Sequence, residues 1–358
     1  MARVTALDIG GANIKGLGPY GAPILRPFEL WRRPEKLAEV LSETLSPLLP
    51  LDWLLVTMTG ELCDCFETKA DGVRRILRSI RSAVSGKRGL RVRVWRTDQR
   101  FVSMEEAIKD PIPSAAANWL ALALLAGRFA PEGHALLVDI GSTTTDIIVL
   151  KEGRPAPKGL TDTERLLSRE LVYTGVARTP VAAVVRDLPY RGELCPVAAE
   201  LFATTLDAYL VLGQTREAPA DRNTADRRPA TKAWARDRLA RMLGADRETF
   251  TEADARAAAA AIKKAQIGHL KRALGKVLEA MGTRPTAVVI SGSGEFLARR
   301  ALAGLHLPIV SLEEKMGSGL STVAPAYALT VLAQEDQGVE GEDVRTPSSR
   351  TTKKKKPV

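Results

Sequence analysis

The 358-residue sequence has few of the residues that build metal centres or disulfide frameworks. It contains three cysteines and three histidines, and it has neither a CxxC pair nor an HExxH motif. An odd, small number of cysteines argues against a disulfide scaffold and against a structural zinc site. The CDC sequence at residues 63–65 leaves redox or metal chemistry open, although buried thiols without a chemical role are the favoured interpretation.

Long apolar runs are also missing. The longest uncharged apolar stretch, residues 111–127, contains Pro113 and Asn118 and is shorter than the roughly 20 residues that a membrane-spanning helix needs. The first residues show no signal-peptide pattern. We therefore expect a cytoplasmic protein with no membrane partner.

Negative charge is in deficit, since 52 Lys and Arg residues outnumber 42 Asp and Glu residues and give a formal net charge of +10. A solvated basic face is the favoured interpretation, and attraction of an anionic substrate is the alternative. No nucleic-acid-binding motif accompanies the charge, so we expect no nucleic-acid partner. Residues 336–358 are predicted to form a disordered charged tail. The oligomeric state stays open, a homodimer included.

Two segments of the chain share one pattern. Residues 7–16 read LDIGGANIKG, and residues 136–150 read LLVDIGSTTTDIIVL. In each, an apolar strand reaches an aspartate, Asp8 or Asp139, and then a glycine turn. The repeat predicts two α/β lobes that each open with a β-hairpin, at residues 1–132 and 133–335, the second lobe with a helical insertion.

Both predicted hairpins carry groups that bind phosphate. Glycine has no Cβ, so it can adopt positive φ and let an oxyanion approach the peptide N–H groups. Lys15 would add a cation, Asp146 is a second acid in the later loop, and Asp8 and Asp139 would hold Mg²⁺ through water, because this ion keeps several waters. The expected phosphate-binding residues are Gly10, Gly11, Asn13, Gly141, Ser142, Thr143, Thr144 and Thr145.

Other glycine motifs are less specific. Gly292, Ser293 and Gly294 end a predicted buried strand before a helix, which favours close approach of a nucleotide base or another phosphate, with a plain strand–helix turn as the alternative. Residues 16–21 (GLGPYG) match the dinucleotide fingerprint but lack the helix that must follow it, so we expect a hairpin turn there. The P-loop pattern GxxxxGK[ST] does not occur.

These features resemble the actin, sugar kinase and Hsp70 superfamily and, within it, the hydantoinase/oxoprolinase family. More narrowly, they are similar to a group linked to tetrahydromethanopterin-dependent one-carbon metabolism. The resemblance spans about residues 3–330, and it implies a duplicated two-lobe, actin-like (ribonuclease H-like) α/β fold with a cleft between the lobes. Besides the two hairpins, its stretches include VTMTGELCDCFETKADGV (56–73), RELVYTGVARTPV (169–181) and TADRRPATK (224–232).

The resemblance also implies a reaction. Archaeal members of the group are implied to join an aminomethylfuran-methyl diphosphate to the phenol of γ-glutamyltyramine, releasing diphosphate on the way to methanofuran. The chain would then bind a small anionic diphosphate substrate with Mg²⁺, and ATP would be a ligand at most. Asp8, Lys15 and Asp139 would act on the leaving diphosphate.

The base that takes the phenol proton is the least defined part of this scheme. Asp64, Glu61 and Asp98 follow predicted strands and are the candidates, with an exposed turn acid or a helix cap as the alternative for each. Glu61 and Asn118 are also assigned, with Gly292, Ser293 and Gly294, to a pocket for a nucleotide base or the substrate.

Two further functions compete with the transferase. One is an ATP-dependent small-molecule kinase or a hydantoinase/oxoprolinase-type hydrolase, although such hydrolases are usually longer or paired with a second subunit. The other is a non-catalytic nucleotide-binding regulator. Retention of Asp8, Lys15, Asp139 and Asp146 argues against a degenerate site.

Overall fold

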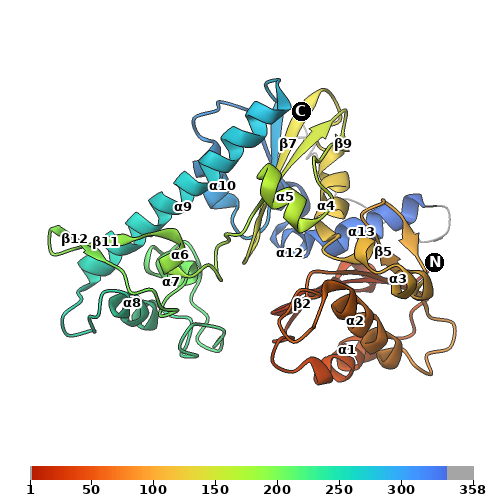
Figure 1. The fold of residues 1–358 in the computed structure, drawn as a ribbon. Helices are drawn as coiled ribbons and strands as arrows, with labels where there is room; N and C mark the ends of the chain where they lie inside the picture. The colour runs from red at the N-terminus through yellow and green to blue at the C-terminus, as the bar shows by residue number, and fades with distance from the viewer. Residues whose placement is uncertain (1, 337–358) are drawn as a thin grey trace, which may run out of the picture. The chain divides into compact units, whose positions relative to one another are not determined.

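The computed structural model describes residues 2–336, so the predicted charged tail lies outside the described residues apart from Asp336. The chain divides into two compact units (Figure 1). Unit 1 contains the residues up to Leu125 together with those from Leu312 onward, and unit 2 contains Ala126–Ser311.

Unit 1 is built on a six-stranded sheet with the order β3-β2-β1-β4-β5-β6. The first three strands form antiparallel pairs, whereas β1, β4 and β5 run parallel to one another. Parallel strands end at the same edge of a sheet, so the segments that follow β1, β4 and β5 emerge together. The strands are β1 (Val4–Ile9), β2 (Asn13–Leu17), β3 (Pro23–Pro27), β4 (Trp53–Met58), β5 (Arg91–Trp95) and β6 (Phe101–Val102).

Helices cover this sheet because both faces are apolar. Leu7, Ile9 and Val56 are fully buried on the face that packs against α1 and α2. The hydroxyl of Thr68 caps α2 by accepting the N–H of Asp71 at 3.1 Å, which satisfies one of the free donors of the first turn. The helices of unit 1 are α1 (Leu37–Leu45), α2 (Lys69–Ala83), α3 (Met104–Lys109), α4 (Asn118–Gly127, which crosses the unit boundary), α11 (Leu312–Met316), α12 (Ser318–Thr322) and α13 (Ala324–Glu335).

The C-terminal helices belong to a different unit from the one expected. The expected second lobe ran to residue 335, whereas α13 packs against β1, β2 and β4 of unit 1. Its buried residues Ala326 and Leu329 are fully enclosed. Apolar burial of this helix therefore ties the end of the described chain back to the first sheet.

Unit 2 repeats the sheet of unit 1. Its order is β10-β8-β7-β13-β14, with β9 beside β8, and its strand directions match those of β3-β2-β1-β4-β5. The expected duplicated, actin-like α/β fold is therefore confirmed. The strands are β7 (His134–Ile140), β8 (Thr145–Lys151), β9 (Arg154–Pro155), β10 (Leu171–Val172), β13 (Ala287–Ser291) and β14 (Ile309–Ser311).

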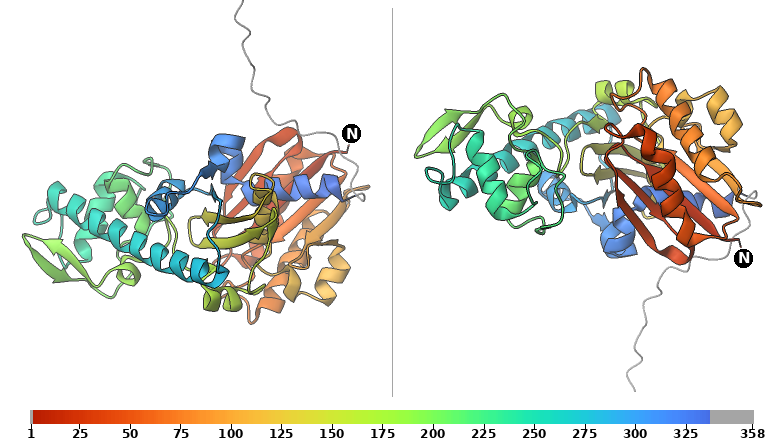
Figure 2. Two further views of the ribbon diagram at one scale, coloured as in Figure 1. Left: turned by 90° about the horizontal axis from the view of Figure 1, so that it is seen from above. Right: turned by 90° about the horizontal axis from the view of Figure 1, so that it is seen from below.

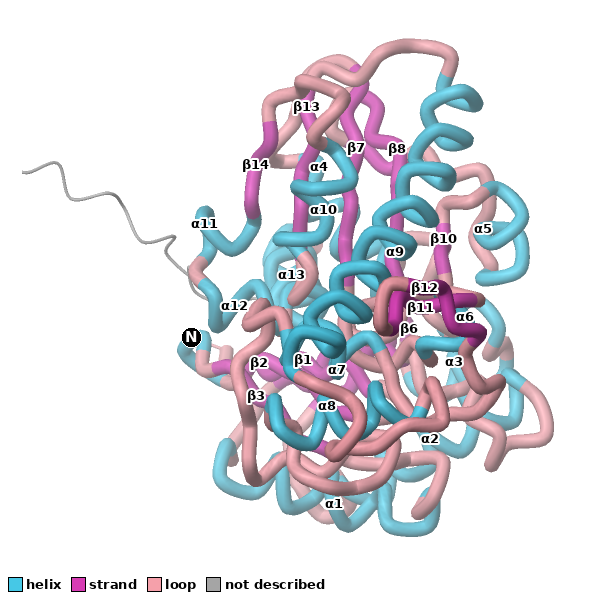
Figure 3. The backbone as a smooth tube through the Cα atoms, turned by 90° about the vertical axis from the view of Figure 1, so that its left-hand side faces the viewer, coloured by secondary structure: helices cyan, strands magenta, loops and turns pink. Residues whose placement is uncertain are grey.

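A long helix connects this sheet to a small helical lobe within unit 2. Helix α9 (Glu252–Met281) starts at a capping box between Thr251 and Asp254 and ends at Gly282, whose φ is +72°. One half of α9 lies beside the sheet, and the other half carries α7 and α8 (Figures 2 and 3). The remaining elements are α5 (Asp162–Ser168), α6 (Val181–Val184), β11 (Asp187–Tyr190), β12 (Glu193–Pro196), α7 (Thr205–Val211), α8 (Lys232–Arg241) and α10 (Glu295–Leu302).

Several predicted elements are shorter in the structure. The apolar pattern predicts a helix over residues 196–213, but α7 begins only at Thr205, because Thr204 and Asp207 form a capping box there. A second predicted helix, residues 114–130, is α4 alone, which starts at Asn118 after Ala116 adopts a φ of +45°. The hairpin of β11 and β12 was not predicted. GLGPYG is a turn between β2 and β3, as expected.

The helices described between residues 2 and 336 do not include one that is both long enough and apolar enough to cross a bilayer.

Candidate functional site

The loop after β1 turns two of its peptide N–H groups away from the segment that follows β3. The carbonyl of Gly11 accepts the N–H of Leu30 at 2.8 Å, and the carbonyl of Ala12 accepts the N–H of Phe28 at 3.0 Å. In a trans peptide the C=O and the following N–H point in opposite directions. These bonds therefore direct the N–H groups of Ala12 and Asn13 away from the segment that holds the carbonyls.

The two glycines of this loop serve packing by the protein itself. Neither Gly10 nor Gly11 has the positive φ that glycine can adopt. A Cβ on Gly10 would lie 2.9 Å from the carbonyl oxygen of Asn13, and one on Gly11 would lie 2.8 Å from Sγ of Cys63. A real Cβ does not approach so closely, so a larger residue would need the backbone of Asn13 to shift at position 10 and the Cys63 side chain to shift at position 11.

The loop after β7 has the same construction. The N–H of Gly141 donates to the carbonyl of Thr144 at 2.9 Å, as the N–H of Gly10 does to Asn13 at 3.0 Å. The carbonyl of Gly141 accepts the N–H of Val176, which directs the N–H of Ser142 the other way. Over the described chain, neither Ser142 nor Thr143 has an acceptor for its backbone N–H. Such N–H groups suit an oxyanion.

The carboxylate of Asp8 lies at the end of β1, buried among polar groups of unit 1. It faces Lys15 on β2 and Thr57 on β4 in register. Nδ2 of Asn118 donates to its Oδ2 at 3.2 Å, which places Asn118 beside the aspartate. A role for Asn118 in a base or substrate pocket stays a prediction. Burial raises the pKa of Asp8 above its ordinary value, and the charge of Lys15 and the bond from Asn118 oppose that shift.

The surroundings of Asp8 fit a hydrated Mg²⁺. Its second oxygen, Oδ1, is buried without a hydrogen-bond partner among residues 2–336, and so is Oγ1 of Thr57. No group of three or more His, Cys, Asp or Glu side chains in the same residues could hold a metal directly. One or two carboxylates with retained waters are the ligand set that Mg²⁺ prefers. Among these residues, protein side chains alone would therefore not surround a metal ion.

The corresponding aspartate of unit 2 has a different neighbour. Asp139 on β7 faces Asp146 on β8, where Asp8 faces Lys15 in unit 1. Asp146 forms an ion pair with Arg165, whose side chain is only 2% exposed. Burial raises the pKa of Asp146, and the guanidinium of Arg165 opposes that rise. Asp146 is therefore committed to holding α5 against the sheet.

The glycines after β13 make room for the end of β7. Gly292 has a φ of +85°, and a Cβ there would lie 2.7 Å from Oδ1 of Asp139. A Cβ on Gly294 would overlap Ile140, whose carbonyl accepts the N–H of Gly294 at 2.9 Å. Close packing thus explains both glycines, while Ser293 between them is exposed. A role for the three residues in binding a base or a phosphate stays a prediction.

The candidate bases differ in their surroundings. Asp98 lies in the turn between β5 and β6, where it pairs with Arg100 at 2.8 Å and with Arg96 at 3.1 Å. Glu61 is buried, 1% exposed, in the segment after β4. Asp64 follows in the same segment, is exposed, and makes no ion pair within the described chain. Of the three carboxylates, Asp64 is the one accessible to a substrate and not engaged by arginine.

A supporting segment beneath the second loop was missed by sequence reasoning. The N–H groups of Ala177 and Arg178 donate to the carbonyl of Ser142 at 3.0 and 2.9 Å. A Cβ on Gly175 would lie 2.6 Å from the carbonyl oxygen of Gly141. Thr145, which we expected to bind phosphate, is buried and donates its hydroxyl to the carbonyl of Thr174 at 2.7 Å. The stretch RELVYTGVARTPV contains this segment, but no recognised motif indicated its role.

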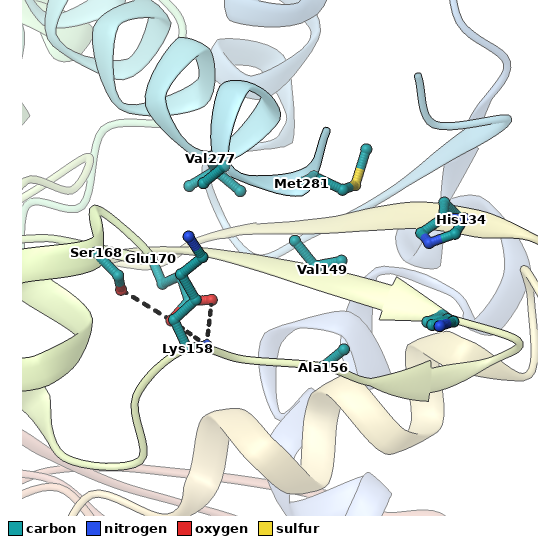
Figure 4. Close-up of a pocket in the computed structure, with 10 residues that line it drawn as sticks. His134, Val149, Ala156, Lys158, Ser168, Glu170, Val277 and Met281 are labelled. Carbon is teal, nitrogen blue, oxygen red and sulfur yellow. Dashed lines mark hydrogen bonds between the residues drawn. The ribbon is translucent and has the colours of Figure 1, made fainter. Parts of the chain in front are cut away.

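A small pocket of unit 2 lies elsewhere (Figure 4). Its volume is about 130 Å³, and it is lined by His134, at the opposite end of β7 from the loop, and by Met281 of α9. Its carboxylate, Glu170, accepts the N–H groups of Lys158 and Gly159 and the hydroxyl of Ser168. Because these donors satisfy Glu170, the residue supports the local loop and the pocket is separate from the hairpin site.

Known proteins resemble this chain over most of its length. Residues 54–335 match the family described as hydantoinase/oxoprolinase. A protein of Methanocaldococcus jannaschii named (4-{4-[2-(gamma-L-glutamylamino)ethyl]phenoxymethyl}furan-2-yl)methanamine synthase is 30% identical over 335 residues, covering 93% of this chain and 98% of its own. A protein of Methanococcus vannielii with the same name is 31% identical over 207 residues, covering 57% and 92%.

Among solved structures, nucleotide-free acetone carboxylase is similar with a TM-score of 0.47 and 12% identity over 90% of this chain. The chain spans about half, 51%, of that protein. The match to the family model and the extent of identity to the methanogen synthase lead to one conclusion: the chain belongs to the hydantoinase/oxoprolinase family.

Proposed function

We propose that the chain is a transferase that joins an aminomethylfuran-methyl diphosphate to the phenol of γ-glutamyltyramine and releases diphosphate. The similarity to the synthases of the two methanogens supports the reaction, since their name describes a phenoxymethylfuran product. The observation that carries the chemistry is found in each hairpin, where the backbone N–H groups of Ala12 and Asn13 after β1, and of Ser142 and Thr143 after β7, have no partner within the described residues. Such groups suit the oxygens of a diphosphate.

The reaction needs a good leaving group more than a strong nucleophile. The C–O bond between the furfuryl carbon and the diphosphate breaks, and both electrons leave with the diphosphate. The phenol oxygen forms the new bond to that carbon and gives up its proton to a base. The furan ring stabilises the positive charge on carbon, so binding of the departing diphosphate lowers the barrier most.

Each described group has a part in this scheme. Lys15 adds positive charge next to the first loop, and the N–H groups of Ser142 and Thr143 serve the second. In unit 1, Asp8 is the residue that would hold Mg²⁺, and Asp139 is its counterpart in unit 2. The ion would neutralise the charge that develops on the diphosphate. Asp64 is our choice for the base, because it is exposed and free of ion pairs along the described chain.

An ATP-dependent kinase or hydrolase of the same family is the competing function. The hairpin N–H groups would serve a triphosphate as well as a diphosphate, so the loops do not separate the two. The experiment that does is a thermal unfolding titration with diphosphate and Mg²⁺ and, in parallel, with ATP and Mg²⁺. A ligand present at 100 times its Kd stabilises a folded protein by about 2.7 kcal/mol, which is several degrees of Tm.

We expect diphosphate with Mg²⁺ to raise Tm and the purified protein to release diphosphate from a furfuryl diphosphate only when a phenol is supplied. Stabilisation by ATP alone, without a response to diphosphate, would overturn the transferase. Release of orthophosphate from ATP in the presence of a small-molecule acceptor would favour the kinase.

A further inference from the structure

We infer that Gln266 of α9 is a positioning residue. Through Gly175, it fixes the loop after β7, residues 141–144, which we call the second phosphate loop. This inference rests on the proposed function. It adds the residue that keeps the loop's N–H groups directed at the ligand. Gln266 lies in the middle of α9 and is fully buried. A buried amide must be hydrogen-bonded to be tolerated, so its partners show which elements it joins.

Both ends of the Gln266 side chain are engaged. Nε2 donates to the carbonyl of Gly175 at 2.8 Å and to the hydroxyl of Thr174 at 2.9 Å. Oε1 accepts the hydroxyl of Tyr209, a fully buried residue of α7. Burial raises the pKa of Tyr209, so its hydroxyl stays protonated and remains a donor. The direction of every bond in this chain is thereby defined.

Further contacts leave the Gly175 peptide little freedom. Its carbonyl also accepts the hydroxyl of Thr205 at 2.8 Å, and its N–H donates to Oγ1 of Thr179 at 2.9 Å. The ring of Tyr209 packs edge-on against Phe296 with centroids 5.0 Å apart. Two helices of unit 2, α7 and α9, thus hold one glycine in place.

The glycine lies directly under the loop. A Cβ on Gly175 would meet the backbone of Ser142 and the N of Thr143 at 2.5–2.6 Å, so the two segments touch through their main chains. The next N–H groups along the segment, from Val176 to Arg178, are those that hold the carbonyls of Gly141 and Ser142. Displacement of Gly175 would therefore rotate the peptides whose N–H groups face outward.

Sequence alone does not indicate this role. Thr174 and Gly175 are 92 and 91 residues away from Gln266 along the chain. Gln266 sits in an alanine- and lysine-rich helical stretch, where a glutamine is an ordinary residue. Its burial and its partners appear only in the folded unit.

The test compares two substitutions in unit 2 that each remove one tyrosine hydroxyl. In Tyr209→Phe the bond to Gln266 is lost, whereas Tyr190→Phe loses a bond to the carbonyl of Thr249 at 2.9 Å, away from the loop. Diphosphate affinity in the presence of Mg²⁺ is measured by calorimetry, and the Tm of the unliganded protein is recorded beside it. We expect Tyr209→Phe to lower the affinity about fivefold and Gln266→Met about tenfold, with Tyr190→Phe unchanged.

A pH series separates positioning from a general loss of packing. In Gln266→Glu the carboxylate cannot donate to Gly175, but the protonated acid can, and burial favours the protonated acid. We expect the affinity of Gln266→Glu, divided by that of the unchanged protein at each pH, to recover as pH falls. A merely structural role predicts a constant ratio.

The outcomes are distinguishable. If the unchanged protein does not bind diphosphate, the proposed function is wrong, and the same variants are tested with ATP, which the loop N–H groups would also bind. If the unchanged protein binds diphosphate, and the Gln266→Met and Tyr209→Phe variants bind it with the same affinity as the unchanged protein, the positioning role of Gln266 is wrong. Should Gln266→Met fail to fold, Tyr209→Phe against Tyr190→Phe decides alone.

Discussion

Lys15 and Asp146 occupy equivalent positions in the two hairpins of this chain. Each lies directly across the hairpin from the aspartate that ends the first strand, Lys15 from Asp8 and Asp146 from Asp139. The first hairpin therefore contributes a cation next to its loop. The second contributes an acid whose charge is already engaged by Arg165. The two hairpins thus share a backbone arrangement and carry side chains of opposite charge at this position. Replacement of Lys15 and replacement of Asp146 should therefore have different effects.

Lys15→Ala should weaken diphosphate binding and leave the fold intact. A hydrogen bond to a charged group contributes about 1.5–3 kcal/mol, so we expect diphosphate affinity to fall by roughly 10- to 100-fold. Calorimetric titration measures it. The control is Lys36→Ala, which removes an exposed lysine paired with Glu39 elsewhere in unit 1. Equal affinities of the two variants would exclude Lys15 from the site.

Asp146→Asn should instead destabilise unit 2. It removes the charge that pairs with the buried guanidinium of Arg165, and breaking a buried ion pair from one side costs about 3–5 kcal/mol. Urea-induced unfolding measures the loss. Glu279→Gln, which breaks an exposed pair with Lys276 on the surface of α9, is the control and should change stability by less than about 1 kcal/mol. A small effect of Asp146→Asn would mean that Arg165 finds another partner.

Gly141→Ala should separate binding from stability. A Cβ at this position meets only the carbonyl oxygen of Thr144, at an ordinary contact distance of 3.6 Å, and the backbone φ is not positive. The protein itself therefore leaves room for a methyl group. We expect an unchanged Tm and about a tenfold loss of diphosphate affinity, because the methyl group would lie where an oxyanion approaches. Gly175→Ala, which overlaps the loop backbone, should lower Tm sharply.

Asp8→Asn should raise stability while it abolishes Mg²⁺-dependent binding. Burial raises the pKa of Asp8 in the folded chain, so the stability linked to this group is complete below the ordinary pKa and is lost as pH rises through the folded value. At neutral pH the buried carboxylate of Asp8 is unfavourable while no metal ion is bound. We expect Asp8→Asn to have a higher Tm than the unchanged protein at pH 7.5 in EDTA, with the difference vanishing below about pH 4, near the ordinary aspartate pKa.

The same pKa predicts how binding depends on pH. Mg²⁺ binds the carboxylate and not the acid, so Mg²⁺-dependent diphosphate affinity should fall with acidification at a pH above the ordinary aspartate value. Affinity measured with and without Mg²⁺ across pH 4–8 checks this. An Asp8→Asn protein that keeps the full Mg²⁺ dependence would show that the ion is held elsewhere.

Asp64→Asn and Asp98→Asn should differ in turnover. If Asp64 takes the phenol proton, its replacement should lower kcat by about 10²–10⁴, with diphosphate binding unchanged. Asp98 is occupied by two arginines, so its replacement should leave kcat within a few-fold of the original. A rate assay of diphosphate release, made at several pH values, decides between the two residues.

The sequence predicted the parts of the site that are local. Asp8 and the glycines after it lie within a few residues of one another, as do Asp139 and Gly141 in the repeat, and each hairpin forms where the pattern placed it. The alternation of apolar strands and amphipathic helices likewise indicated a duplicated sheet. These features depend on neighbouring residues, whose periodicity is visible without the fold.

Contacts between distant residues could not be predicted. Asn118 reaches Asp8 across 110 residues, and nothing near Asn118 in the chain indicates this contact. Thr145 looked like a phosphate ligand by its position in a threonine run, but alternation along β8 buries its hydroxyl. The end of the second unit was misplaced because α13, as an apolar helix, fits either sheet by pattern alone.

On the proposed function, the hairpin loops would offer a ligand their main chain and not their side chains. Replacing a residue there by any other leaves a peptide N–H in place, except when the new residue is proline. Alanine substitution at residues 13, 142 and 143 would consequently miss the site, while substitutions beneath the second loop, at residues 175 and 266, would reveal it. Proteins related to this chain could then differ in the residues at these loop positions, as long as the hydrogen bonds to the loop carbonyls are kept.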